Sequence, residues 1–192
     1  MLRVTLLASL VVAVTCLLLP ALTLAAGAAD APALEYKVKA GYLFNFAKLV
    51  EWPTNALPAT DSPLIIGVLD AGEALPALQT LLAGKTVNQH PVQVLAVQAE
   101  HLGSGLHLLF VTRAAGKSPA ELTLALRGAP TLLVGENEGF AQHGGSLNFY
   151  KLDNSVKFEA NPDAAARARL KLGSQLLKLA RVVRDAPAAK KE

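Results

Sequence analysis

Histidines are the residues of this chain that could bind a metal ion, and their spacing argues against it. The chain has four, at His90, His101, His107 and His143. A metal site needs clustered ligands at defined spacing. None of the four forms an H-x-x-x-H pair, and none belongs to a carboxylate motif. We therefore expect no metal site, and nothing else in the sequence predicts a cofactor.

Two serines in glycine-rich segments are the candidate nucleophiles. A hydrolase needs an exposed serine on a strained turn, with a histidine and an acid close by. Ser104 lies between two glycines, but the segment is not a G-x-S-x-G elbow and it precedes an apolar run instead of following one. Ser146 opens a predicted strand. Both fit turn positions better, so a catalytic triad is not predicted.

Two carboxylates, Glu136 and Glu138, follow the apolar run 131–134 and could take part in acid–base chemistry. A glutamate is a poor general acid unless its surroundings raise its pKa, and the sequence shows no apolar pocket around this pair. The alternative is a structural loop in which Phe140 packs on the core and Gly139 permits the turn. The structural loop is the interpretation we prefer.

Asp70 follows the apolar run 64–69, at the edge where open α/β sheets bind ligands. The turn after it has one glycine and lacks both a G-x-G-x-x-G pattern and a Walker lysine, so it does not resemble a phosphate site. A lone aspartate here is also a common N-cap of the following helix. Ligand binding at this edge and helix capping both remain open.

Short apolar runs predict the sheet that would position these residues. Continuous apolar runs are typical of strands buried on both faces. Such strands are predicted at 64–69, 106–112 and 131–134, and a further strand, in which Gln93 can face outward, is predicted at 92–97. Helical patterns at 73–82 and 118–127 alternate with them, the second with a cap and first-turn proline at Ser118-Pro119. This order predicts a single three-layer α/β/α domain with a mostly parallel sheet.

The C-terminal third predicts a β-hairpin followed by one long helix. The runs 147–152 and 156–159 are joined at Asp153-Asn154, a turn-prone pair. Asn161-Pro162 is an N-cap with a first-turn proline, and the helix is predicted to reach about Val183.

That predicted C-terminal helix carries a core stripe and a basic stripe on different faces. The core stripe is Ala165, Ala168, Leu172, Leu176, Leu179 and Val183, and the basic stripe is Arg167, Lys171, Ser174, Lys178 and Arg181. A basic stripe is either a solvated face or a docking surface for an acidic partner or a phosphorylated ligand. Residues 185–192 predict a disordered tail.

Residues 1–28 predict a secretory signal peptide. Arg3 precedes an apolar run, and Ala26-Gly27-Ala28 is a cleavage motif; an uncleaved membrane anchor is the alternative. The mature chain would be exported, most simply into a bacterial periplasm. Of 18 basic and 15 acidic residues only Arg3 lies in the signal, which leaves 17 against 15 and gives no indication of nucleic-acid binding.

The one cysteine, Cys16, also lies within the predicted signal, in a poor context for lipidation. Its removal would leave a mature chain without a thiol. Disulfides, thiolate metal ligands and thiol catalysis would then be excluded.

The segment 36–53, YKVKAGYLFNFAKLVEWP, holds five of the ten aromatic residues of the chain. At helical spacing one apolar face contains Tyr36, Ala40, Leu43, Phe44, Ala47 and Val50, and a second contains Tyr42, Phe46 and Leu49. A helix with two apolar faces is buried on both, or buried on one and offered to a partner on the other. Pro53 is expected to end this helix.

The same segment carries a family resemblance. VKAGYLFNFAKLVEWP resembles the opening signature of the YfiR family of small periplasmic proteins. Further blocks follow in the order of that family: PLIIGVLD, LLAGKTVNQHPVQV, LLFVTR, TLLVGENEGFAQHGGSLNFYKLDNSVKFEAN and ARLKLGSQLLKLARVV. The resemblance covers residues 36–184, and its two end blocks are the specific ones.

The resemblance implies a regulator and not an enzyme. YfiR-type proteins bind the periplasmic sensor domain of an inner-membrane diguanylate cyclase and repress cyclic-di-GMP synthesis, and with it biofilm formation. Some members carry cysteines that form disulfides and respond to redox state, which a cysteine-free mature chain would lack. The alternative function is a periplasmic protein that binds a small ligand and passes its state to a membrane partner.

The candidate partner-binding residues come from the two end blocks, which we expect to form one docking surface. They are Asn45, Phe46, Lys48, Glu51 and Trp52 from the first block, and Lys178, Arg181 and Arg184 from the second. Trp and Arg are residue types that often anchor interfaces. The sequence also leaves a homodimer open.

Overall fold

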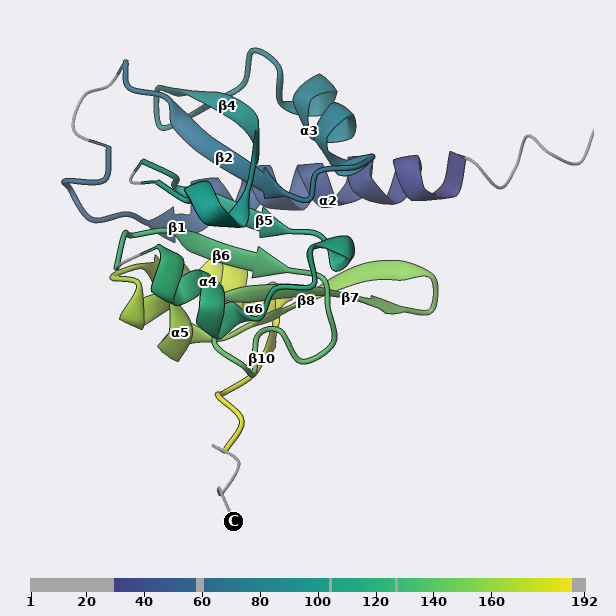
Figure 1. Cartoon of the computed structure of the whole chain (residues 1–192), viewed down its shortest axis with the longest axis vertical. Coiled ribbons are helices and arrows are strands. Elements are labelled where there is room, and N and C mark those ends of the chain that lie inside the picture. The colour runs from purple at the N-terminus through teal and green to yellow at the C-terminus, as the bar shows by residue number, and fades with distance from the viewer. Residues whose placement is uncertain (1–29, 58–60, 104, 127, 188–192) are drawn as a thin grey trace, which may run out of the picture.

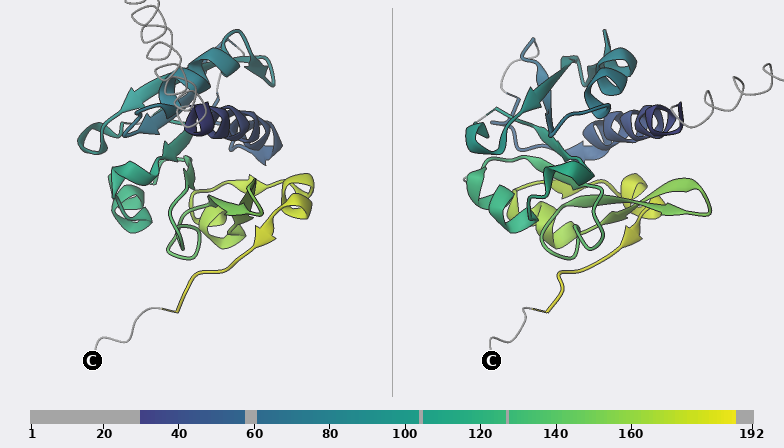
Figure 2. Two further views of the ribbon diagram at one scale, coloured as in Figure 1. Left: turned by 90° about the vertical axis from the view of Figure 1, so that its right-hand side faces the viewer. Right: turned by 45° about the vertical axis from the view of Figure 1, so that its right-hand side comes forward.

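A curled, mostly parallel sheet organises the chain in the computed structural model, which describes residues 30–57, 61–103, 105–126 and 128–187 (Figures 1 and 2). Its eight strands lie in the order β10-β8-β7-β6-β5-β2-β4-β3. Five of the seven strand pairs are parallel, and β7–β8 and β3–β4 are antiparallel. The mixed α/β class and the mostly parallel sheet are therefore confirmed. The predicted signal peptide lies outside the described residues.

The four predicted apolar strands form the centre of this sheet. They are β2 (Leu64–Leu69), β4 (His90–Val97), β5 (Leu108–Val111) and β6 (Leu132–Gly135). Continuous apolar runs identified β2, β5 and β6 because their neighbours cover both faces, whereas Leu95 of β4 is 45% exposed. The short strand β3 (Thr86–Val87) pairs with β4 at one edge of the sheet.

The predicted hairpin is also confirmed, as β7 (Leu147–Leu152) and β8 (Ser155–Ala160). Asp153 and Asn154 form its two-residue turn, and both have positive φ, at 47° and 59°. A turn with two left-handed residues matches the twist of the flanking strands. β7 joins the sheet by pairing in parallel with β6.

Helices pack on both faces of the central strands. Alternate residues of β2, β5 and β6 enter two separate hydrophobic clusters. The larger cluster receives α2 (Asp30–Leu49) and α3 (Ala74–Leu82), and the smaller receives α4 (Pro119–Ala125). Ser118 and Glu121 cap α4 reciprocally. Two 3-10 turns, η1 (Ala99–His101) and η2 (Arg113–Ala115), complete the connections.

Helix α2 ends at Leu49, earlier than Pro53 would require. The next two residues form β1 (Val50–Glu51), which pairs antiparallel with β9 (Lys171–Leu172) in a separate two-stranded sheet. The strand pairing, and not the proline, therefore sets the end of the helix.

The predicted long C-terminal helix is wrong. The chain forms α5 (Pro162–Arg167), β9, α6 (Ser174–Leu179) and β10 (Arg181–Val182) instead. Arg169 has φ +60°, which ends α5. From Arg169 to Leu172 exposed and buried residues alternate, the period of a strand.

This break also divides the two predicted stripes. Leu172 and Leu176 are buried, but Leu179 is 73% exposed. Asp185, in the segment predicted as a disordered tail, pairs with Arg167, and residues 188–192 lie outside the described residues.

Candidate functional site

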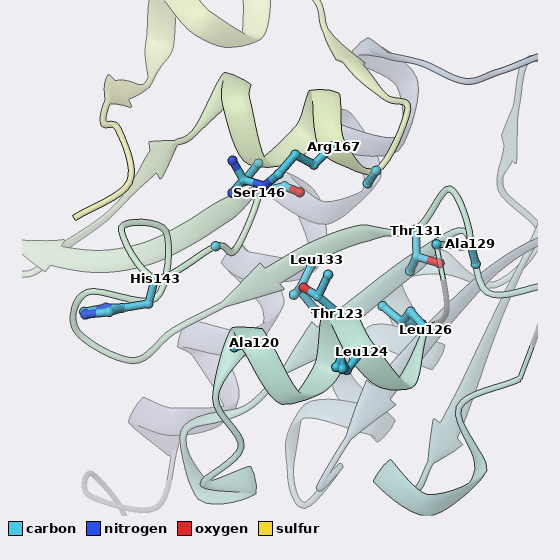
Figure 3. A pocket seen from close by; sticks show the side chains of 14 residues that line it. Ala120, Thr123, Leu124, Leu126, Ala129, Thr131, Leu133, His143, Ser146 and Arg167 are labelled. Carbon is cyan, nitrogen blue, oxygen red and sulfur yellow. The ribbon is translucent and has the colours of Figure 1, made fainter. Parts of the chain in front are cut away.

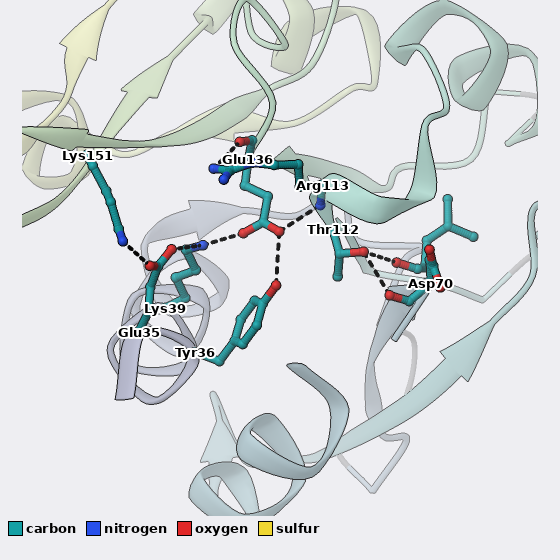
Figure 4. Close-up of polar contacts among 9 residues, drawn as sticks. Glu35, Tyr36, Lys39, Asp70, Thr112, Arg113, Glu136 and Lys151 are labelled. Atoms are coloured by element: carbon teal, nitrogen blue, oxygen red, sulfur yellow. Dashed lines mark hydrogen bonds and ion pairs between the residues drawn. The ribbon is translucent and has the colours of Figure 1, made fainter. Parts of the chain in front are cut away.

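A topological switch point lies between β2 and β5. From β2 the chain passes through α3 to β4 on one side, and then crosses to β5 on the other. Ligands of open α/β sheets bind at the carboxyl ends of strands at such a point. Asp70 follows β2, Thr112 and Arg113 follow β5, and Glu136 follows β6 (Figure 4).

Side chains of the opening helix fill the adjoining space, around Glu136. The carboxylate of Glu136 is 4% exposed. Its Oε1 accepts hydrogen bonds from the Tyr36 hydroxyl, at 3.2 Å, and from the Arg113 backbone N–H, at 2.7 Å. Its Oε2 forms an ion pair with the buried ammonium of Lys39. The Lys39 Nζ also lies 4.9 Å from the centre of the Tyr36 ring.

The ion pairs continue outward to the hairpin. Glu35 lies 2.6 Å from Lys39 and 2.5 Å from Lys151 of β7, whose side chain is 57% exposed. We call Glu35, Tyr36, Lys39, Arg113, Glu136 and Lys151 the Glu136 cluster (Figure 4). It connects α2, the loops after β5 and β6, and the hairpin.

Neighbouring groups and burial shift the pKa values of Tyr36 and Glu35 within the cluster. Burial, and then the Glu136 carboxylate that accepts its hydrogen bond, raise the pKa of Tyr36, so the phenol stays protonated. Burial alone would raise the pKa of Glu35, but hydrogen bonds from Lys151 and Lys39 outweigh it and hold that pKa below its usual value.

This geometry favours a structural role for Glu136. Both oxygens of its carboxylate are already engaged, by the Tyr36 hydroxyl, the Arg113 backbone N–H and the Lys39 ammonium, so the side chain joins these elements to one another. Glu138 is exposed and lies outside the cluster. The preferred loop interpretation is supported at Phe140, which is 3% exposed and packs so closely that a Cβ on Gly135 or Gly145 would lie 2.3 Å from its ring.

Asp70 does not have the capping role that the sequence left open. Its backbone has φ +51°, and the Thr112 hydroxyl donates to the carbonyls of Leu69, at 3.0 Å, and Asp70, at 2.8 Å. The N-cap residue of α3 is Glu73 and not Asp70.

The histidines have structural surroundings. His107 accepts a hydrogen bond from the Ile65 N–H at Nδ1, so its Nε2 carries the proton toward the Ala56 carbonyl, 2.9 Å away. Burial lowers the pKa of His107, which keeps the ring neutral. Among the described residues, no group of three His, Cys, Asp or Glu side chains could hold a metal ion.

The first end block is divided between core and surface. Phe46 is 1% exposed and stacks on Phe149, so its side chain offers no area to a partner and leaves the candidate set. Trp52 is half-buried, and its indole N–H donates to the Ala47 carbonyl at 3.1 Å. The candidates that remain on the surface are Asn45, Lys48 and Glu51.

The second end block is exposed but largely paired. Arg181 forms an ion pair with the buried Glu159, and its guanidinium lies 4.3 Å from the centre of the Tyr150 ring. Arg184 pairs with Asp163 at 2.6 Å. Lys178 is exposed, and no ion pair of Lys178 occurs within the described part of the chain.

The two end blocks meet in space, although not at all the expected residues. β1 pairs with β9, α2 packs against α6, and Glu51 lies 2.9 Å from Lys171. Arg181 lies on β10, beside β8 at the edge of the large sheet. The two blocks therefore meet at the β1–β9 pair and at the contact between α2 and α6, with Glu51 and Lys171 on the surface there.

Sequence reasoning singled out Glu136 but missed the residues that surround it in the Glu136 cluster. Tyr36 was assigned to an apolar face, and Lys39 received no role. Their spacing of three residues places both on one side of a helix, which is the available signal. The partner Glu136 is 97 residues from Lys39, so local pattern could not identify it.

A separate pocket of about 410 Å³ lies between α4 and α5 (Figure 3). Leu133 of β6 lies at its base. Its walls are mainly small residues, and Arg167 lies at its edge. The wall residues include Ala120, Thr123, Leu124, Gly144, Ala164 and Ala168.

Comparison with known proteins places the chain in a family. A family model described as YfiR/HmsC-like matches residues 36–181. The chain belongs to this family. The YfiR/HmsC-like match begins at Tyr36 of the Glu136 cluster and ends at Arg181, so it includes the β1–β9 junction. Proteins of this family are periplasmic, and membership indicates a regulator. None of the helices in the described ranges is long and apolar enough to cross a membrane.

One solved structure supports the fold of this YfiR/HmsC-like chain. A conserved domain protein from Vibrio cholerae O1 biovar El Tor aligns with a TM-score of 0.52 and 10% sequence identity. The alignment covers 77% of this chain and 59% of that chain, so this chain spans less than two thirds of that protein. At this identity the likeness concerns the fold alone. No curated protein sequence matches the chain.

Proposed function

We propose that this protein binds the periplasmic sensor domain of an inner-membrane diguanylate cyclase and represses cyclic-di-GMP synthesis. The family match over residues 36–181 carries this proposal. The described residues add no metal cluster, and the buried carboxylate at the strand ends is neutralised by its own neighbours. Export through a cleaved signal at residues 1–28 is part of the same proposal.

The partner would dock where the two end blocks meet. The proposed docking surface consists of Asn45, Lys48, Glu51, Lys171, Lys178 and Leu179. β1–β9 pairing and α2–α6 packing join the two blocks that supply these residues, which supports the proposal. Leu179 supplies exposed apolar area beside Lys178, a combination that suits an acidic, partly apolar partner surface.

Arg181 and Arg184 border this surface and are proposed as its rim. Both are held by ion pairs, with Glu159 and Asp163 respectively. An arginine already fixed in place loses less side-chain entropy on binding than a free one. Trp52 lies beneath the surface as a support, because its indole N–H is bonded to Ala47.

Co-purification tests the function directly. The protein would be tagged at its C-terminus, expressed in its own host and captured from gently solubilised envelopes, with proteins identified by mass spectrometry. We expect a membrane-bound diguanylate cyclase with a periplasmic domain. Recovery of other envelope proteins but no cyclase, from several detergents, would contradict the proposal.

A further inference from the structure

The pocket between α4 and α5 has the dimensions and chemistry of a small-ligand site. We call it the α4–α5 slot. Its volume of about 410 Å³ falls within the range of about 300–1,000 Å³ that is usual for small-molecule pockets. Sequence analysis placed a possible ligand at Asp70, on the other side of α4, so this slot is a different site.

Small side chains keep the slot open. Ala120 and Thr123 of α4 line the slot together with Ala164 of α5 and Ala168, the residue that follows α5. None of these side chains is long enough to fill the space between the helices. Leu124 is 68% exposed at the slot, so apolar area there is left in contact with water. A ligand with an apolar body would cover that area, which is favourable in proportion to the area removed from water.

The slot has one cationic side chain among its lining residues. Arg167 is one of its lining residues, and none of the described lining residues is acidic (Figure 3). Arg167 at present holds a carboxylate from the chain itself: its Nη1 and Nη2 donate to Asp185 at 2.7 and 3.0 Å. The guanidinium is therefore positioned to bind a carboxylate with two hydrogen bonds.

The pair with Asp185 is easily exchanged. The side chains of Arg167 and Asp185 are about half exposed, and exposed ion pairs contribute little net stability because water competes for both charges. A ligand carboxylate could take the place of Asp185 while its apolar part entered the slot.

We propose that the α4–α5 slot binds a small amphiphilic carboxylate, with Arg167 on the carboxylate and the apolar chain between the helices. The walls limit the length of that chain, because helices of seven and six residues are about 10 Å long. A short fatty acid matches this length. The proposal does not depend on the regulatory function proposed above.

Binding of such a ligand would loosen the end of the chain. Asp185 also accepts a hydrogen bond from the buried Asn161 side chain, at 2.8 Å, and the next N–H, from Ala186, donates to the Gln142 carbonyl at 2.7 Å. A carboxylate that displaces Asp185 from Arg167 removes one of the contacts that hold this segment.

Titration calorimetry of the mature protein with octanoate tests the proposal. We expect a dissociation constant of about 0.1–1 mM, as suits a ligand of this size. Arg167→Gln should weaken binding about fivefold, because the carboxylate loses its partner. Asp185→Asn should tighten it about threefold, because the competing carboxylate is gone.

Two further measurements identify the slot and the ligand chemistry. Ala120→Phe introduces a ring from an exposed position of α4 and should abolish binding while the melting temperature stays within a few degrees. Octanol, which lacks the carboxylate, should bind more weakly than octanoate. Octanoate would be titrated up to about 10 mM, which is about tenfold above the weakest dissociation constant expected. If no heat of binding is seen in that range, the proposal is wrong. Binding unchanged by both Arg167→Gln and Ala120→Phe would overturn it as well.

Discussion

The Gly173 N–H donates a hydrogen bond to the Leu49 carbonyl at 3.0 Å, and a Cβ on Gly173 would lie 2.5 Å from that same oxygen. This contact joins the last residue of α2 to the residue after β9. It brings together segments that lie more than a hundred residues apart in sequence. The neighbouring residues, Val50 and Leu172, form the first pair of the β1–β9 ladder.

Gly173→Ala should destabilise the protein by about 1–3 kcal/mol, because the added methyl group forces backbone atoms apart. Urea unfolding followed by circular dichroism measures the change. Gly41→Ala is the matched control: a Cβ there meets nothing within 4 Å, and the position is helical. The control should be neutral or more stable by about 0.5–1 kcal/mol. Equal effects of the two variants would show that the close approach at Gly173 is unimportant.

Lys39→Met should destabilise the protein by about 3 kcal/mol, because it leaves the buried Glu136 carboxylate without its cation. Lys151→Met, at the exposed end of the same cluster, should cost at most about 1 kcal/mol. Chemical denaturation of both variants gives the comparison.

The double variant Lys39→Met/Glu136→Gln separates charge from packing. It should recover part of the stability lost in Lys39→Met, since no unpaired charge is then buried. A double variant less stable than Lys39→Met would contradict the ion-pair explanation.

The stability contributed by Glu35 should disappear in acid. Hydrogen bonds from Lys151 and Lys39 hold its folded-state pKa below the ordinary value of 4.5. A carboxyl group with a lowered pKa contributes stability that is present above the unfolded-state pKa and is lost as the pH falls through the folded-state pKa. Glu35→Gln should therefore lower the urea midpoint at pH 7, with a difference from the parent protein that shrinks below pH 4.5. A difference that grows in acid would have the wrong sign.

Charge reversal on the proposed docking surface should weaken partner binding without unfolding the protein. Lys178→Glu and Leu179→Asp change exposed residues and should each reduce affinity for the cyclase sensor domain about tenfold or more. Lys37→Glu, an exposed lysine near the start of α2 and about 16 Å along the helix from Lys48, is the control and should bind normally. Surface plasmon resonance measures the affinities. An equal loss of affinity in all three variants would show that overall charge, and not this surface, controls binding.

The sequence predicted the elements whose signals are local. β2 coincides with the predicted run 64–69, the Asp153-Asn154 turn joins the hairpin, and Ser118 caps α4 as expected. Each depends on residues within a few positions of one another. Burial on both faces produces continuous apolar runs, and turns with positive φ favour Asp and Asn.

Features that depend on distant partners could not be predicted this way. The segment from Arg169 to Leu172 is too short to distinguish a helical from a strand period, and its strand forms because Val50 pairs with Leu172. Glu136 was interpreted as a loop carboxylate because its ion-pair partner, Lys39, is distant in sequence and no local pattern links the two.

The candidate surface shows the same limit. Lys48 is exposed and Phe46 is buried, although both belong to the same helical pattern. The reason is that the aromatic residues of the hairpin cover only one side of α2. Two apolar faces left open whether the helix was buried on both sides or offered one side to a partner. They could not indicate which side would remain open.

Cellular cyclic-di-GMP measures the central proposal most directly. The nucleotide would be quantified by mass spectrometry in the host with the gene intact, deleted, and restored on a plasmid. A repressor of a diguanylate cyclase predicts a rise on deletion that the plasmid copy reverses. An unchanged or lower level on deletion would contradict the proposed function.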